Sequence, residues 1–227
     1  MGLSWCHMKS RPHKSSDFPL CRELNAIILI TAMNKSPRFA GVIFDMDGTL
    51  TIPTIDFKAV RRELGVVEGV DLIEAQRGLD PGERARFWAV IERHELAACG
   101  NPTFQAGVRD ALRRFEDAGV RLAVMTRNSR KSADAVLSRI GVRFDPILTR
   151  EFEPVKPAPE PAHHILRTWG VAAKEVLVVG DYRDDLLCGR AAGCATCFFH
   201  NDGATSYADL ADHVVSSFGE LSKVVFS

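Results

Sequence analysis

The chain has 227 residues, of which 46% are hydrophobic and 26% charged, a composition typical of one globular α/β domain with a small addition. Lysine plus arginine number 29 and aspartate plus glutamate also 29, so no overall basic charge attracts nucleic acid or an anionic membrane. Since no apolar run reaches the ~20 residues that cross a bilayer, we expect neither a nucleic-acid nor a membrane partner.

The first 37 residues are rich in Arg, Lys, His and Ser and contain only two acids, Asp17 and Glu23. This composition partly resembles an organelle transit peptide. The two acids and the weak amphipathic pattern favour a flexible extension instead, and therefore a cytoplasmic protein. Targeting to mitochondria or plastids is the alternative interpretation.

The first predicted strand lies in Gly41-Val-Ile-Phe-Asp-Met-Asp-Gly-Thr-Leu50. Its apolar residues indicate a buried parallel strand, and Asp45 and Asp47, two residues apart, point the same way off its end. Parallel sheets bind ligands at this end of their strands, and two close carboxylates resist ionising together, so one suits a nucleophile and the other an acid. Gly48 allows a tight turn there. The alternative is that both acids only cap a turn.

Residues 53–103 follow with helical periodicity and no convincing strand, which predicts an inserted helical lid. The clearest helix begins at Asp80 as N-cap, with Pro81 in its first turn and Glu83 completing a capping box. Phe87, Val90 and Ile91 form an apolar stripe that we expect to pack inside the lid, with Trp88 displaced from it. The arginines of the lid include Arg77, Arg84, Arg86 and Arg93. We expect these four to be solvated surface residues, and the alternative is that they bind an anionic group of a substrate.

Two further strands, over residues 120–125 and 175–180, are each followed by polar residues. Thr126 follows the first strand, and Asp181 follows the second, with Asp184 and Asp185 close behind. Each position has a simpler explanation, because Thr caps helices and acids stabilise helix N-termini. Their shared place at strand ends nevertheless predicts that they meet in one crevice.

The whole pattern predicts a doubly wound, Rossmann-like parallel sheet with strands near residues 40, 120, 146, 175, 195 and 214. Helices over residues 107–118 and 130–140 fit as connections, since each is followed by glycine.

Lys156 lies in a proline-rich stretch, Glu153-Pro-Val-Lys-Pro-Ala-Pro-Glu-Pro161, whose backbone is stiff. Most loop lysines are solvated, but a lysine held in a stiff loop can be directed at a phosphate. An aspartate that approaches a dianionic phosphate to ~4 Å meets two repulsions of about 4 kcal/mol each. A lysine and a divalent cation would offset that repulsion.

The cysteines are too irregularly spaced for a disulfide framework, which favours a reducing compartment. Cys194 and Cys197 match a C-x-x-C redox or zinc motif. No second pair accompanies them, and residues three apart on a strand face opposite sides, so we expect buried, inert thiols.

In content and order these motifs resemble the haloacid dehalogenase superfamily, and specifically its phosphatases with a helical cap, which are similar to phosphoglycolate phosphatase. The resemblance spans about residues 38–227. Asp45-Met-Asp47-Gly-Thr-Leu is similar to the first motif, Thr126 to the second, Lys156-Pro to the third, and Gly180-Asp181 with Asp185 to the fourth. One departure is Arg127, where relatives often have Asn; Asn128 comes one residue later.

The resemblance implies a catalytic core over residues 38–52 and 104–227 and a cap over residues 53–103. It implies a Mg²⁺-dependent phosphatase that hydrolyses a small phosphomonoester through an aspartyl-phosphate on Asp45. Asp47 would be the general acid and base, while Thr126 and Lys156 would bind the phosphate oxygens. The implied ligands of Mg²⁺ are the Asp45 carboxylate, the Asp47 carbonyl, Asp181 and Asp185, with Asp184 either sharing that role or capping a helix.

Other functions remain open at this point. A phosphosugar mutase of the same superfamily would keep the same motifs. A phosphonatase would need a lysine in the cap, and the only one, Lys58, lies close to the first motif. A non-enzymatic phospho-accepting signalling module also combines acids, Mg²⁺, a hydroxyl and a lysine, but its acceptor lies on a middle strand. The expected partner is a small phosphorylated metabolite, and the sequence does not indicate an oligomeric state.

Overall fold

The computed structural model describes residues 36–201 and 206–227. The prediction for the N-terminal extension, residues 1–37, therefore lies almost wholly outside the described residues. Pro37–Ser227 forms one compact unit. Among the described residues, no helix has both the length and the apolar character needed to cross a bilayer.

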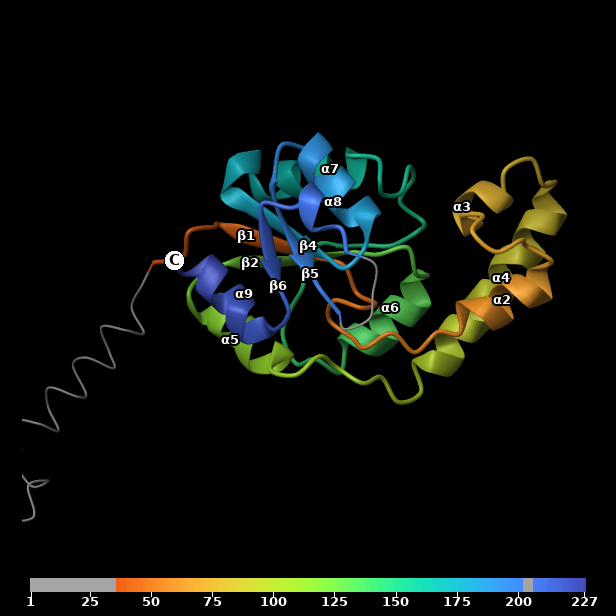
Figure 1. The fold of residues 1–227 in the computed structure, drawn as a ribbon, viewed down its shortest axis with the longest axis horizontal. Helices are drawn as coiled ribbons and strands as arrows, with labels where there is room; N and C mark the ends of the chain where they lie inside the picture. Colours follow the sequence, from red (N-terminus) through yellow and green to blue (C-terminus); the bar gives the residue numbers. More distant parts are fainter. Residues whose placement is uncertain (1–35, 202–205) are drawn as a thin grey trace, which may run out of the picture. The chain divides into compact units, whose positions relative to one another are not determined.

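Six parallel strands form one sheet (Figure 1). They are β1 (Gly41–Phe44), β2 (Arg121–Met125), β3 (Ile147–Leu148), β4 (Val176–Gly180), β5 (Ala195–Phe199) and β6 (His213–Val215). Their order is β3-β2-β1-β4-β5-β6, and every neighbouring pair is parallel. The chain thus builds outward from β1 in one direction and then from β4 in the other, which confirms the predicted doubly wound sheet.

Helices cover both faces of this sheet (Figure 1). One face packs against α5 (Val108–Asp117), α6 (Arg130–Leu137) and α9 (Phe218–Val225), and the other against α7 (Glu160–Trp169) and α8 (Arg183–Ala191). Single turns of 3₁₀-helix occur at Ala173–Glu175 and Ala208–Leu210. Val42 and Phe44 of β1 face the first layer and Ile43 faces the second. Burial on both sides explains why the strand is apolar throughout.

The stretch between β1 and α5, residues 53–103, is called the helical segment below. It contains α2 (Phe57–Leu64), α3 (Leu72–Ala75) and α4 (Pro81–Ala98). Val60 of α2 packs against Phe87 and Ile91 of α4 in a separate small apolar cluster. The predicted start of α4 is confirmed, because Asp80 accepts hydrogen bonds from the backbone of Gly82 and Glu83.

The helical segment leaves and rejoins the sheet domain at one place. Thr51 and Phe104 form an antiparallel bridge. The Ile52 N–H donates to the Thr103 carbonyl at 2.8 Å, and the Gln105 N–H donates to the Leu50 carbonyl at 3.0 Å. The two linkers that join the helical segment to the sheet domain therefore run side by side, directly beyond the end of β1.

The C-x-x-C pair has the predicted structural role. Cys194 packs in the apolar layer that contains α7 and α8, and Cys197 packs in the opposite layer. Burial raises the pKa of the Cys194 thiol to about 11 and that of Cys197 to about 12. Both thiols therefore stay protonated and unreactive at neutral pH.

Candidate active site

Three carboxylates meet at the point where the sheet changes direction. Asp45 follows β1, Asp181 follows the neighbouring strand β4, and Asp185 lies in the first turn of α8. One carboxylate oxygen from each lies within 4.8 Å of the others. The register of β1 against β4 brings together residues that are more than 130 positions apart in the chain.

Two close backbone contacts fix this geometry. Gly48 has a φ of +83°, and a Cβ atom there would lie 2.1 Å from an Asp181 carboxylate oxygen. A Cβ atom at Gly180 would lie 2.2 Å from the Cβ of Asp185. Only glycine allows both approaches, so these two residues set how tightly the acids gather.

Lys156 lies between two of the acids. Its Nζ donates hydrogen bonds to the carboxylates of Asp45 and Asp185, the latter at 2.5 Å, and the side chain is only 5% exposed. Burial by itself would lower the pKa of Lys156, but the adjacent Asp185 and Asp45 outweigh burial and raise it. The lysine is therefore a fixed cation in the site.

Asp47 is separated from this cluster by its own hydrogen bonds. Its carboxylate accepts from the Asn128 amide at 2.6 Å and from the Thr51 hydroxyl at 3.2 Å. Burial, together with the nearby charge of Asp45, raises the pKa of Asp47 to about 6. A carboxyl group with this pKa is able to give up and regain a proton near neutral pH.

Thr126 follows β2 and is 4% exposed. Its hydroxyl oxygen accepts the Asn128 N–H at 3.2 Å, and the hydroxyl can donate its hydrogen into the adjoining cavity. Thr126 thus supplies a neutral donor opposite the charged groups.

All six side chains that the sequence singled out line one cavity of about 370 Å³: Asp45, Asp47, Thr126, Lys156, Asp181 and Asp185. The helical segment forms the opposite wall, which is largely apolar. Its apolar lining residues are Pro53, Phe57, Leu72, Ile73, Trp88 and Ile91, and its charged lining residues are Arg61, Asp71 and Glu95. The cavity is therefore rich in acids on the side of the sheet and mostly apolar on the side of the helices.

Some lining residues were not identified from the sequence, or were placed differently. Trp88, predicted to be displaced from the apolar stripe, packs against the Phe87 cluster and lines the cavity. The cavity contains Arg61 and Arg127, whereas Arg93 forms a surface ion pair with Glu63. Asn128, one residue beyond the expected position, holds Asp47. The resemblance had drawn attention to Arg127 and Asn128 beside the second motif, but no sequence signal marked Arg61 or Trp88 as residues of the cavity.

Asp184 does not join the cluster of three carboxylates, and its side chain forms an ion pair with Arg127 at 3.1 Å instead. This ion pair was not predicted. Asp185, by contrast, combines two contacts: one carboxylate oxygen accepts from Lys156, and the other accepts the Tyr182 N–H at 3.1 Å.

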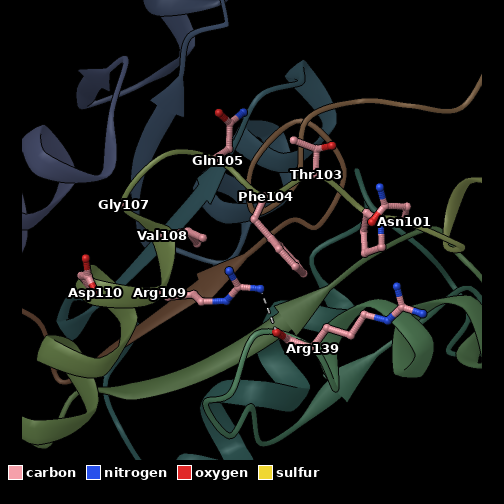
Figure 2. Close-up of a pocket in the computed structure, with 10 residues that line it drawn as sticks. Asn101, Thr103, Phe104, Gln105, Gly107, Val108, Arg109, Asp110 and Arg139 are labelled. Atoms are coloured by element: carbon pink, nitrogen blue, oxygen red, sulfur yellow. Dashed lines mark hydrogen bonds between the residues drawn. The ribbon is translucent and has the colours of Figure 1, made fainter.

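A larger hollow of about 650 Å³ lies elsewhere, at the end of the helical segment and the start of α5 (Figure 2). Its two arginines already have contacts within the protein. Arg109 donates to the Arg139 carbonyl at 3.1 Å and stacks over Phe104, while Arg139 donates to the Gly100 carbonyl at 3.0 Å. None of the clustered acids lines this hollow, so we do not place the chemistry there.

The three clustered carboxylates fit a hard divalent cation. Carboxylate oxygens are the donors that such ions prefer, and three of them converge here. Burial and the neighbouring acids also raise the pKa values of Asp181 and Asp185, which shows that negative charge at this place is poorly compensated by the protein alone.

Comparisons with known proteins agree with this geometry. The family model "Haloacid dehalogenase-like hydrolase" matches residues 58–199. A haloacid dehalogenase-like hydrolase domain-containing protein of Arabidopsis thaliana is 34% identical over 182 residues, which cover 75% of this chain and 74% of that protein. A phosphoglycolate phosphatase of Photobacterium profundum is 26% identical over 216 residues, covering 81% of this chain and 94% of the relative.

Among solved structures, CbbY from Rhodobacter sphaeroides in complex with phosphate has the same fold, with a TM-score of 0.62 and 22% identity. The similarity covers 81% of this chain and 96% of CbbY. The match of the family model and the identity to the Arabidopsis protein show that this chain belongs to the haloacid dehalogenase-like hydrolase family.

Proposed function

We propose that this protein is a Mg²⁺-dependent phosphatase that hydrolyses a small phosphomonoester, with Asp45 as the nucleophile. The proposal is carried by one observation: the four residues with proposed catalytic roles line the same cavity as Asp181, which follows β4, and Asp185, which lies in the first turn of α8. The four residues are Asp45, Asp47, Thr126 and Lys156. The family relatives named as phosphoglycolate phosphatases support phosphate chemistry.

In the first step, a carboxylate oxygen of Asp45 attacks phosphorus. The bond from phosphorus to the ester oxygen breaks, and Asp47 gives its proton to that leaving oxygen. The raised pKa of Asp47, about 6, suits this role because a useful fraction of the carboxyl groups is protonated near neutral pH.

In the second step, a water molecule attacks phosphorus while the deprotonated Asp47 takes its proton. The bond between phosphorus and Asp45 breaks, and inorganic phosphate leaves with the original carboxylate restored. The hydrogen bonds from Asn128 and Thr51 hold Asp47 in place for both proton transfers.

Electrostatic stabilisation comes from groups that are already in position. Lys156 contacts Asp45 directly, so it also lies beside any phosphoryl group bound to that carboxylate. Mg²⁺, held by Asp45, Asp181 and Asp185 and by the carbonyl of Asp47, would neutralise charge on the phosphate oxygens. Thr126 would donate its hydroxyl hydrogen to a third oxygen.

The helical segment acts in this proposal as a cap over the cavity. Its apolar wall excludes water and accommodates the organic part of the substrate, and a cavity of about 370 Å³ suits a small molecule. A phosphomonoester with an apolar or aromatic portion matches this two-sided cavity.

The test is phosphate release from a panel of phosphorylated metabolites and from p-nitrophenyl phosphate, with and without Mg²⁺. We expect turnover that needs Mg²⁺ in the wild type and a loss of about 10³-fold or more in Asp45→Asn. Asp117→Asn, an exposed acid at the end of α5, is the matched control and should behave as wild type.

Equal rates in the wild type and in Asp45→Asn would contradict the proposal. Product analysis with phosphosugars separates hydrolysis from a mutase reaction, since a mutase returns the phosphoryl group to the sugar and releases little phosphate.

A further inference from the structure

Arg127 connects the helical segment to the catalytic loops. One guanidinium nitrogen, Nη1, donates to Asp71 at 3.1 Å and to Asp184 at 3.1 Å. Asp71 belongs to the helical segment, whereas Asp184 lies in the first turn of α8 beside the cluster acid Asp185. The side chain of Arg127 also lines the cavity that contains Asp45.

Asp71 performs two separate functions with its two carboxylate oxygens. Oδ1 accepts the Ile73 N–H at 2.7 Å and so caps the N-terminus of α3, while Oδ2 accepts from Arg127. The contact with Arg127 therefore acts on the residue that starts α3. Leu72 and Ile73, the next two residues, are part of the apolar wall of the cavity.

Apolar packing of α3 is limited. The helix has four residues and none of them is fully buried, although Leu72 and Ala75 pack against the small apolar cluster of the helical segment. A helix this short is not stable by itself, so its position depends on the cap and on contacts of the cap residue. Among the described residues, Arg127 is the basic side chain that ties Asp71 to the sheet domain.

The strength of the contact suits an attachment that opens and closes. Arg127 is 32% exposed and Asp71 38% exposed, and ion pairs at this exposure are weak. Glu95 of α4 differs: it is 3% exposed, pairs with the nearly buried Arg150, and accepts hydrogen bonds from the Ser129 N–H and the Ser132 hydroxyl. The C-terminal half of α4 is thus fixed firmly to the sheet domain, while α3 is held by a contact that solvent can replace.

We propose that Arg127 is a positioning residue that latches α3 over the cavity by bridging Asp71 and Asp184. The proposal rests on the phosphatase function above and adds to it a residue that couples cap closure to the catalytic loops. In the latched state Leu72 and Ile73 complete the wall around the substrate. In the unlatched state the cavity is open on the side of α3.

The test uses Asp71→Asn, Arg127→Gln and the double variant. Asparagine is a good N-cap, so Asp71→Asn keeps the cap on α3 and removes only the ionic contact. Glu74→Gln is the matched control. Glu74 lies on α3 and pairs with Arg77, which follows that helix, and this ion pair does not reach the sheet domain.

The first measurement is hydrogen exchange of the amides of residues 66–79 without any ligand. We expect exchange about fivefold faster in Asp71→Asn and in Arg127→Gln than in the wild type, and unchanged in Glu74→Gln. Amides of β1 and β4 should keep their protection in all variants, which shows that the fold is intact. Wild-type exchange over residues 66–79 in both latch variants would overturn the proposal.

The second measurement is the hydrolysis of p-nitrophenyl phosphate with Mg²⁺. Loss of the latch makes the closed, binding-competent state less populated, which raises KM and leaves kcat nearly unchanged. We expect KM to rise about fivefold in each single variant, which corresponds to ~1 kcal/mol of binding free energy. KM should rise no further in the double variant, because both substitutions break the same contact.

The two proposals fail in different ways. If Arg127→Gln raises KM while Asp71→Asn does not, Arg127 binds the substrate directly and the latch is wrong. If the wild type hydrolyses none of the phosphomonoesters but the exchange results are as expected, the latch stands and the phosphatase proposal fails.

Discussion

The sheet domain and the helical segment are stabilised in different ways. Both faces of the sheet are covered by extensive apolar layers, whereas the helical segment has a cluster with three buried residues, Val60, Phe87 and Ile91. The groups proposed to carry out chemistry extend from the densely packed part. The residues that would cover the substrate belong to the lightly packed part. Dense packing thus coincides with the need for fixed geometry, and light packing with the need for substrate entry.

The largest effect that would test this comparison comes from removing one aromatic side chain in each region. Phe115 is fully buried beneath β2, and Phe87 is buried in the small cluster of the helical segment. We expect Phe115→Ala to lower the free energy of unfolding by about 3–5 kcal/mol and Phe87→Ala by about 1–2 kcal/mol, since a small cluster can collapse around the cavity. Urea denaturation measures both. Equal losses would show that the helical segment is as rigidly packed as the sheet.

Next comes the buried attachment of α4. Glu95→Gln leaves Arg150 without its partner in a nearly buried position, and we expect a loss of about 3 kcal/mol in the free energy of unfolding. Replacing both residues with methionine should recover most of that stability, because no unpaired charge remains. A single variant as stable as the wild type would show that α4 is not fixed by this ion pair.

A smaller effect follows from the clustered acids in metal-free protein. Burial raises the pKa of Asp47 to about 6 and also raises that of Asp181, so both are higher than in the unfolded chain. Their favourable contribution to stability is complete below about pH 4 and is lost as the pH rises through 6 and above. We expect Asp181→Asn to stabilise the metal-free protein at pH 8 by at least ~1 kcal/mol and to have less effect at pH 5.

With Mg²⁺ bound, the wild type should become more stable than Asp181→Asn at pH 8. The ion stabilises the wild type at pH 8, and Asp181→Asn should respond to it much less because a ligand oxygen has lost its charge. Thermal unfolding with EDTA and with Mg²⁺ gives both comparisons. A wild type whose unfolding temperature is the same in the two conditions would contradict the assignment of the three carboxylates as a metal site.

The smallest effect is expected on the surface of the helical segment. Glu63 pairs there with Arg93 and His94; Glu63 and Arg93 are exposed to solvent, and His94 is partly buried. We expect Glu63→Gln to leave the unfolding midpoint and the phosphatase KM unchanged within error, since exposed pairs add little. A clear shift would mean that even the outer surface of this segment contributes to its position.

The sequence was sufficient for the sheet and for six of the side chains that line the cavity on its side. Continuous apolar runs identified β1, β2 and β4, and the polar residues directly after them had to meet because parallel strands share one carboxyl end. The position of Gly48 directly after the strand also predicted the tight turn that the structure contains there. Their catalytic and metal-binding roles remain predictions that the experiments above test.

The contacts between the helical segment and the sheet domain had no such signal. Glu95 looks like any other helical glutamate, and its partner Arg150 is 55 residues away. Trp88 was placed off the apolar stripe because periodicity detects a single packed face. Helix α4 has two such faces: Phe87 and Ile91 pack toward α2, and Trp88 lies under the Arg150 guanidinium beside the cavity. Such pairings depend on the folded arrangement of distant segments.

The bridge between Thr51 and Phe104 has a consequence for how this architecture can diversify. Because the chain departs and re-enters through adjacent residues, an exchange of the intervening stretch leaves the ends of the sheet domain in place, provided that the new stretch also supplies a partner for Arg150. A two-residue turn that joins positions 52 and 103 would close the gap, since these residues already share a backbone hydrogen bond. New substrate preferences can therefore be grafted onto an unaltered reaction centre.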